Sequence, residues 1–402
     1  MRGTALGRER TTPVVKAVVC RNSELRVDER AALVPGPRQV LLAVERCGIC
    51  GSDLHLRRHG DQMKQLMLRM NYPHFPLASE AVVFGHEFCG EVLEYGLGSA
   101  KSVKPGTRVC AVPLVRNGPD IDLLGLSARS PGAYAERVVV EESMIMPVPN
   151  GLGVDRAALT EPMAVGHHAV RRGEVGKGDV AIVIGCGPVG LAVIAILRSR
   201  GVRTIVASDF SPGRRELARR CGATVVVDPA ATSPYANWKA YGFLHDAPAL
   251  LELAVGTREK LGKLPFPWWQ SWGLIDKLGL RPKRPVIFEC VGVPGVLQQI
   301  LAGAPLMSRV VVVGVCMQLD TIEPALAVNK EIDLRFVLGY SALEFRETLH
   351  AIAHGKVDAS AMLTGMVGLD GVAGAFEALA DPERHAKILI DPKRTGAAIA
   401  SV

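Results

Sequence analysis

Hydrophobic and polar residues follow two different patterns along the chain, and the change falls near residue 155. Before it, apolar runs bounded by turn residues predict strands at 14–20, 39–46, 108–112 and 134–140, and no long helix is expected there. After it, β-branched runs alternate with helical stretches, which is typical of βαβ units around a parallel sheet. The expected strands are 180–184, 204–208, 224–227, 286–289 and 310–313. The tail adds helices at 344–354 and 372–379 and a strand at 387–390.

Length and composition define the class of protein. A chain of 402 residues is long enough for two or three domains. Its composition, 48% hydrophobic and 22% charged residues, excludes a disordered or fibrous chain. The nine cysteines are odd in number and scattered in apolar contexts, which predicts reduced thiols and a cytoplasmic location. Arg2, Arg8 and Arg10 are not followed by an apolar segment, so no secretory signal is expected.

An uncharged run of 18 residues, 180–197, has the length of a membrane span, but it contains the sequence Gly185-Cys-Gly187-Pro188-Val189-Gly190. This G-x-G-x-x-G spacing instead predicts a strand that turns tightly into a helix. The glycines let the backbone turn and approach a pyrophosphate, which then lies at the helix N-terminus. We therefore predict a dinucleotide site here.

Acidic and basic residues beyond this turn bear on the choice of dinucleotide. Asp209 follows Gly190 by 19 residues, at the end of the next predicted strand, where a carboxylate can accept hydrogen bonds from both ribose hydroxyls. The carboxylate would repel a 2′-phosphate, so NAD is favoured over NADP. Arg214 and Arg215 follow closely and could tolerate a phosphate.

A thiol, a hydroxyl, a carboxylate and an imidazole occur within nine residues, in Cys47-Gly-Ile-Cys50-Gly-Ser52-Asp53-Leu-His55, and His86-Glu87 follow later. Catalytic zinc takes three protein ligands and keeps one position open. Taken singly, Cys47 and Cys50 also fit a redox pair, and His86-Glu87 fits the start of H-E-x-x-H, which fails because position 90 is glycine. Their joint occurrence before a dinucleotide fingerprint favours a catalytic metal site.

These motifs, in this order, resemble a zinc-dependent alcohol dehydrogenase of the medium-chain dehydrogenase/reductase superfamily over nearly the whole chain. The matching stretches are 47–55, 85–92, 159–169, 180–190 and 371–390, and Glu161-Pro162 resembles the sorbitol, threonine and glucose dehydrogenase branch. The resemblance implies an α/β fold in two domains. A GroES-like β-rich catalytic domain is expected at 1–162, completed by 337–402. A Rossmann domain with a doubly wound parallel sheet is expected at 163–336, with an insert at about 229–285.

The resemblance also implies the roles of single residues. Cys50 rather than Cys47 is the expected zinc thiolate and His86 the imidazole ligand, while Glu87 and Glu161 are candidates for the remaining positions, directly or through water. Asp53 would orient a ligand by a hydrogen bond. Ser52 would take the proton from the alcohol, and His55 would pass it to solvent through the cofactor ribose. His167 and His168 are expected to be structural.

Two departures from the family pattern give further expectations. No cysteine lies between Cys110 and Tyr134, where much of the family binds a structural zinc, so we expect one catalytic zinc ion and no structural zinc. The stretch 57–83 is longer and more polar than in a minimal enzyme and is expected near the substrate mouth.

The expected function is hydride transfer between an alcohol, of the secondary alcohol or polyol class, and NAD. Two alternatives stay open: a zinc-independent NAD(P)H-dependent enone or quinone reductase, and a non-catalytic dinucleotide-binding protein. The expected partners are a small alcohol or carbonyl substrate and further copies of the chain in a dimer or tetramer. No basic stripe runs through a known reading motif, so nucleic acid is not expected.

The insert 229–285 holds all four tryptophans and eight basic against four acidic residues, a net charge of +4 out of +7 for the whole chain. Two interpretations are open. The aromatic residues pack the insert onto the sheet edge or a neighbouring subunit, or residues 264–284 make a weak membrane or lipid contact.

Overall fold

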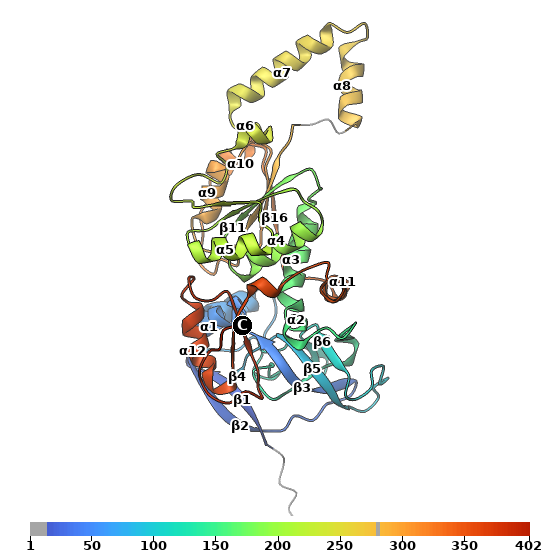
Figure 1. Ribbon diagram of the computed structural model, residues 1–402, viewed down its shortest axis with the longest axis vertical. Coiled ribbons are helices and arrows are strands. Elements are labelled where there is room, and N and C mark those ends of the chain that lie inside the picture. Colours follow the sequence, from blue (N-terminus) through green and yellow to red (C-terminus); the bar gives the residue numbers. More distant parts are fainter. Residues whose placement is uncertain (1–13, 279–281) are drawn as a thin grey trace, which may run out of the picture. The chain divides into compact units, whose positions relative to one another are not determined.

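The computed structural model describes residues 14–278 and 282–402, and the chain divides into two compact units (Figure 1). The first unit contains the chain up to Glu161 together with Leu363–Asp381 and Lys387–Val402. The second contains Pro162–Met362 and Pro382–Ala386. The expectations about Arg2, Arg8 and Arg10, and Arg281 of the insert, lie outside the described residues.

The first unit is built mainly from antiparallel strands. Its largest sheet has the order β10-β6-β5-β3-β18-β17, with β9 also paired to β3. The strands are β3 (Gln39–Gly48), β5 (Glu87–Tyr95), β6 (Arg108–Ala111), β9 (Arg137–Glu141), β10 (Ile145–Pro147), β17 (Leu363–Val367) and β18 (Lys387–Ile390). A smaller sheet joins β1 (Val14–Arg21) to β2 (Glu24–Ala31) and β4 (Val82–Val83), and β7 (Leu114–Asn117) forms a hairpin with β8 (Asp120–Leu123). The helices α2 (Val154–Ala157) and α12 (Val372–Leu379) complete the unit.

The first unit also contains α1 (Gly51–Arg69), a 19-residue helix with a kink at His59, so the expectation of no long helix before residue 155 is wrong. The apolar positions of this segment are sparse, which hid the helical period from the sequence. Its start is fixed by Asp53, whose carboxylate accepts a 3.0 Å hydrogen bond from the backbone N–H of Cys50. Its later part is tied to the following loop, because Lys64 donates to the carbonyls of Pro73 and Phe75. The stretch 57–83 is therefore an ordered helix and loop.

The second unit is a six-stranded sheet of order β13-β12-β11-β14-β15-β16 in which every neighbouring pair is parallel. The strands are β11 (Val180–Ile184), β12 (Thr204–Ser208), β13 (Val225–Val227), β14 (Pro285–Glu289), β15 (Arg309–Val312) and β16 (Asp333–Phe336). The first five confirm the predicted strands to within a residue or so. The order reverses between β11 and β14, which is where ligands bind in doubly wound sheets.

The helices of the second unit connect these strands and extend beyond them. They are α4 (Pro188–Ser199), α5 (Pro212–Cys221), α6 (Trp238–Tyr241), α7 (Ala247–Gly262), α8 (Trp268–Lys277), α9 (Val296–Gly303), α10 (Pro324–Asn329) and α11 (Ala342–Ala353), with α3 (Thr160–Gly173) at the boundary. His167 and His168 of α3 lie within 3.1 Å of Thr348 and Glu344 of α11. These contacts place α11 with the second unit, whereas the sequence-based division returns to the first domain at 337. None of the described helices is long and apolar enough to cross a membrane.

Candidate functional site

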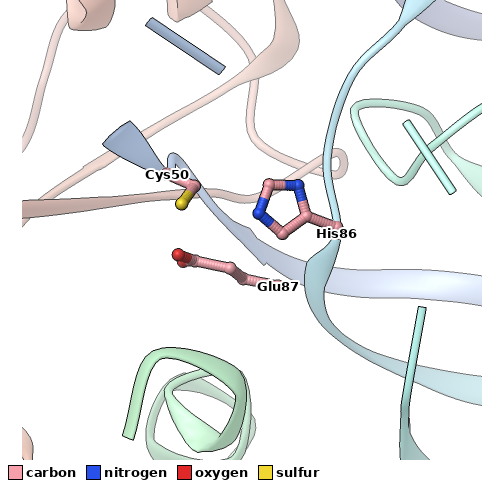
Figure 2. A group of neighbouring side chains, drawn as sticks. All are labelled: Cys50, His86 and Glu87. Atoms are coloured by element: carbon pink, nitrogen blue, oxygen red, sulfur yellow. The ribbon is translucent and has the colours of Figure 1, made fainter. Parts of the chain in front are cut away.

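Three potential metal ligands from separate parts of the sequence meet in the first unit. The ligand atoms of Cys50, His86 and Glu87 all lie within 4.8 Å of one another, and Figure 2 shows the three side chains turned toward a common point. The antiparallel pairing of β3 with β5 brings them together, since Gly48 lies opposite Glu87. A Cβ atom on Gly48 would collide with the Glu87 carboxylate, so a side chain at this position would displace Glu87. Thiolate, imidazole and carboxylate form a ligand set that suits zinc.

The imidazole of His86 is held between two residues of α1. Its Nε2 lies 3.3 Å from the Ser52 hydroxyl and its Nδ1 lies 3.5 Å from Oδ1 of Asp53. Asp53 is itself fixed, because its other oxygen accepts a 2.7 Å hydrogen bond from the Tyr134 hydroxyl. A carboxylate behind a histidine ligand sets the orientation of the ring and its basicity, which is the role expected for Asp53.

The electrostatics of this pocket favour a bound cation. Burial opposes a charge on His86, yet the anionic groups of Asp53 and Cys50 raise the pKa of His86 well above its usual value. Oδ1 of Asp53 and Nδ1 of His86 lie 3.5 Å apart and have no hydrogen bond to any other described residue, so the Asp53 charge acts directly on the ring. Surroundings that favour a proton on His86 equally favour a metal ion, so the residues present fit a zinc site.

Glu87 forms a buried ion pair that the sequence did not predict. The ammonium group of Lys387, on β18, lies 2.8 and 2.7 Å from the two carboxylate oxygens, and both side chains are 1% exposed. Lys387 also donates a 2.9 Å hydrogen bond to the carbonyl of Ile49. The lysine therefore fixes Glu87 and the chain just before Cys50.

Glu161, the other candidate carboxylate, is buried but does not belong to the group of three atoms within 4.8 Å. Its negative charge still helps to raise the pKa values of His86 and Lys387. Cys47 lies apart as well, and burial raises its pKa well above the usual value for a thiol, which keeps it protonated. Of the four ligand candidates, the structure brings Cys50, His86 and Glu87 together.

Ser52 and His55 lie three residues apart on α1 and therefore on the same side of the helix. His55 is half-buried, and burial together with the nearby His59 and Arg58 lowers its pKa. A neutral imidazole accepts protons, so this environment suits a group that receives a proton from Ser52. The ring centroids of His55 and His59 are 6.3 Å apart.

In the second unit, the glycines between β11 and α4 have distinct structural roles. Gly185 adopts φ +89°, which a residue with a side chain rarely reaches, and a Cβ atom on Gly190 would collide with the carbonyl of Gly185. A Cβ atom on Gly187 would meet nothing within 4 Å, so the space beside this backbone is open. Gly187 caps the N-terminus of α4, with Pro188 and Val189 in its first turn. The residues thus fit a dinucleotide pyrophosphate.

The charged residues after β12 are held in different ways. Asp209 accepts hydrogen bonds from the N–H groups of Cys186 (2.7 Å) and Ser211 (2.9 Å), which ties it to the glycine-rich turn. Arg215 binds the carbonyl of Asp209 and the carboxylate of Asp228. Arg214 instead has a buried Nε without a hydrogen-bond partner. Of the two arginines, it is therefore the one more available to bind a cofactor phosphate.

The lobe that follows Cys110 is organised by one buried carboxylate. Asp122 accepts hydrogen bonds from Asn117 (2.7 Å), Ser130 (2.8 Å) and Arg129 (2.8 Å). Burial opposes the charge of Asp122, but the bonds from Arg129 and Asn117 lower its pKa below the usual value. This network holds together the β7–β8 hairpin and the loop after it.

Sequence reasoning missed Tyr134 and Lys387. Both act through residues that are distant in sequence, namely Asp53 and Glu87. The available signal was the lysine at the start of an otherwise apolar strand, Lys387–Ile390, which is completely buried in the structure. A buried lysine requires an anionic partner.

Two family models match the chain: the alcohol dehydrogenase GroES-like domain at residues 36–150 and the zinc-binding dehydrogenase model at residues 188–354. The chain is 31% identical to (R,R)-butanediol dehydrogenase of Bacillus subtilis, over 92% of this chain and 97% of that protein. It is 26% identical to sorbitol dehydrogenase of the same organism, over 94% and 98%. The crystal structure of 2R,3R-butanediol dehydrogenase from Bacillus subtilis matches with a TM-score of 0.70 and 28% identity, over 94% and 100% of the two chains. These matches confirm the predicted fold class.

Proposed function

Because the chain belongs to the zinc-dependent alcohol dehydrogenases of the medium-chain dehydrogenase/reductase superfamily, oxidoreductases that use NAD(P), we propose that it oxidises a secondary alcohol or polyol at Cys50, His86 and Glu87. The approach of these three side chains to a common point is the observation that carries the proposal. Butanediol and sorbitol, named in the relatives, are both compounds with neighbouring hydroxyl groups. We therefore propose a vicinal diol or polyol as the substrate.

In this proposal each residue has a separate task. Cys50, His86 and Glu87 hold one zinc ion, which lowers the pKa of an alcohol hydroxyl and polarises a carbonyl. Glu161 would contact the zinc ion through a water molecule. Asp53 and Tyr134 orient His86, and Lys387 limits the movement of Glu87. No structural zinc is expected, since hydrogen bonds to Asp122 organise the lobe after Cys110.

The proton and the hydride leave by different routes. Ser52 accepts the hydroxyl proton, and His55 passes it toward solvent, for which its lowered pKa is suitable. The N-terminus of α4, with Gly185, Gly187, Pro188, Val189 and Gly190, binds the pyrophosphate of the hydride acceptor. Asp209 accepts hydrogen bonds from the ribose hydroxyls and thereby favours NAD. Arg214 binds a 2′-phosphate and so allows some use of NADP.

Metal analysis combined with turnover tests this proposal. Wild-type protein should hold about one zinc per chain and reduce NAD with diols or polyols. Cys50→Ser should lose the zinc and the activity, whereas Cys47→Ser should keep both. Undiminished turnover in metal-free protein would favour the zinc-independent reductase. Zinc and cofactor binding without turnover of any alcohol in a broad panel would favour a non-catalytic dinucleotide-binding protein.

Beyond the small-molecule substrate, we propose a homo-oligomer formed at the free edge of β16, the last strand of the parallel sheet. Phe336, the last residue of β16, and Leu338 just after it are exposed, which is costly unless another surface covers them. Light scattering of wild type and Phe336→Ser would test it. We also propose a cytoplasmic location, supported by nine cysteines that all remain unpaired.

A further inference from the structure

The insert divides into a part that packs on the second unit and a part that does not. Trp238, on α6, packs against the hydrophobic core that includes Tyr235 and Phe243 and stacks on His245. Helices α7 and α8 follow and form a helical hairpin that extends from the second unit (Figure 1). Within α7, Leu261 is the single buried residue. The packing interpretation therefore applies to Trp238, and the other three tryptophans need a separate explanation.

The turn between the two helices and the first turn of α8 carry exposed apolar side chains. Leu264, Phe266 and Trp269 are 47%, 66% and 61% exposed. Further exposed apolar residues are Leu251, Leu253 and Val255 on α7 and Trp272 and Leu274 on α8. An apolar turn at the end of a helical hairpin can enter a lipid layer without any change in the rest of the fold.

The aromatic residues of the hairpin form an ordered cluster. The guanidinium of Arg258 lies 4.5 Å from the centre of the Trp268 ring, and the rings of Trp269 and Trp272 contact Trp268 edge to face. Trp268 is thus the inner member, and its two neighbours are held with their rings toward solvent. Little conformational entropy is lost when such fixed rings enter an interface, and tryptophan prefers the boundary between lipid and water.

The charges around the turn complement an anionic surface. Residues 259–269 carry Lys260 and Lys263 against one acidic residue, Glu259, and both lysines are exposed beside the apolar turn. Lys277 ends α8, and Lys283 follows in the return segment. Lysines that flank exposed aromatic and aliphatic residues are typical of segments that lie in the headgroup region of anionic bilayers.

We propose that the α7–α8 hairpin docks the protein on an anionic bilayer surface, with Leu264, Phe266 and Trp269 entering the acyl boundary and Lys260 and Lys263 contacting lipid phosphates. The contact is peripheral, because no described helix could span a membrane. Membrane docking does not depend on the metal site, so its test is independent of the test of the proposed alcohol oxidation.

Vesicle binding tests the proposal with full-length protein. Wild type should sediment with vesicles of phosphatidylglycerol and phosphatidylcholine, less with phosphatidylcholine alone, and less again at high salt. Phe266→Ser/Trp269→Ser should reduce partitioning about ten-fold or more, and Lys260→Gln/Lys263→Gln should abolish the preference for anionic vesicles. The control is Leu319→Ser, at a side chain that is 99% exposed outside the insert, which should bind as wild type does.

Intrinsic fluorescence gives a second readout, because all four tryptophans lie in the insert. Anionic vesicles should shift the emission of wild type to shorter wavelength, and Trp269→Phe should remove most of the shift. Equal, weak binding of wild type and the Phe266/Trp269 variant would overturn the proposal. So would a loss of oligomers in that variant without vesicle binding by wild type, since the hairpin would then bind a second copy. Turnover without vesicles should be unchanged in every variant.

Discussion

Lys387 forms a completely buried ion pair with Glu87, one of the three candidate metal ligands, and both carboxylate oxygens lie within 2.8 Å of the ammonium group. The pair joins the last strand of the first unit to the strand that carries a ligand. It has two consequences, one for stability and one for metal binding, and both can be measured.

Replacing Lys387 by methionine leaves the Glu87 carboxylate buried without a counter-charge. In metal-free protein, Lys387→Met should lower the free energy of unfolding by about 3–5 kcal/mol. Zinc should restore more stability to the variant than to wild type, because the ion replaces the missing positive charge. Urea unfolding with and without zinc measures both effects. The control Lys393→Met removes a 70% exposed lysine 3.9 Å from Glu45 and should change stability by less than about 1 kcal/mol; equal losses in the two variants would contradict the prediction.

The contact from Asp53 to His86 predicts an effect on zinc affinity. Asp53→Asn should weaken zinc binding about 10- to 100-fold, because the ring loses its anionic partner. Tyr134→Phe should have a smaller effect of the same sign. Competition with a chromophoric chelator measures both. Tyr95→Phe is a matched control, since it removes a hydroxyl that donates to the Val103 carbonyl elsewhere in the unit, and a loss of affinity there would show that the effect is not specific.

The lowered pKa of His55 predicts the acid limit of alcohol oxidation. Because the imidazole stays neutral below its usual pKa of 6.5, the acid limb of kcat should lie below pH 6.5. His55→Gln should reduce kcat by up to about 10²-fold and remove this limb, with partial rescue by a small diffusible base. His59→Gln should instead move the limb to higher pH, since a positive neighbour is lost, with little change in the maximal rate. An unchanged profile in both variants would remove His55 from the proton path.

We expect substitutions at Asp209 and at Arg214 to change the preference for NAD over NADP in opposite directions. Asp209→Asn should lower the ratio of kcat/KM for NAD over NADP about 10-fold or more, because the repulsion of the 2′-phosphate is lost. Arg214→Gln should raise the ratio by removing the available guanidinium. Steady-state kinetics with NAD and with NADP measure this ratio of kcat/KM values. Arg219→Gln, which removes an exposed pair with Glu216, is the control and should leave the ratio unchanged.

The environment of Glu344 leads us to expect a specific change in the free energy of unfolding at acid pH. Burial opposes its ionisation, but hydrogen bonds from Ser341 and His168 lower its pKa to about 2, against 4.5 in the unfolded chain. The folded state therefore gains stability above pH 4.5, and the gain is lost as pH falls from 4.5 to 2. The gain amounts to about 2 kcal/mol, because solvent screens the charge at Arg171, a half-exposed residue whose Nε lies 2.6 Å from the Glu344 carboxylate. The stability difference between wild type and Glu344→Gln should disappear over this pH range; a constant difference would contradict the assignment.

The sequence predicted some parts of this molecule well, for physical reasons. The parallel strands, such as Val180–Ile184, are buried on both faces and therefore appear as continuous apolar runs. Cys50 and His86 were found because their motifs are local. The helix α1 was missed because its buried residues, Asp53, Leu56 and Gly60, have helical spacing but only Leu56 carries a large apolar side chain, so the hydrophobic pattern does not show the period. Lys387 was missed because its partner, Glu87, lies 300 residues earlier in the chain.

The position of β18 has a further consequence for the order in which the protein matures. This strand pairs with β3 beside Cys47 and Gly48, and the N–H of Ile49 bonds to the carbonyl of Ile388. Ribosomes make the chain from its N-terminus, so Cys50, His86 and Glu87 leave the ribosome long before Lys387 does. The three ligands are thus made before two strands of the central sheet of their unit, β17 and β18. The metal site can therefore be completed only after β18, with Lys387, has been made and has paired with β3.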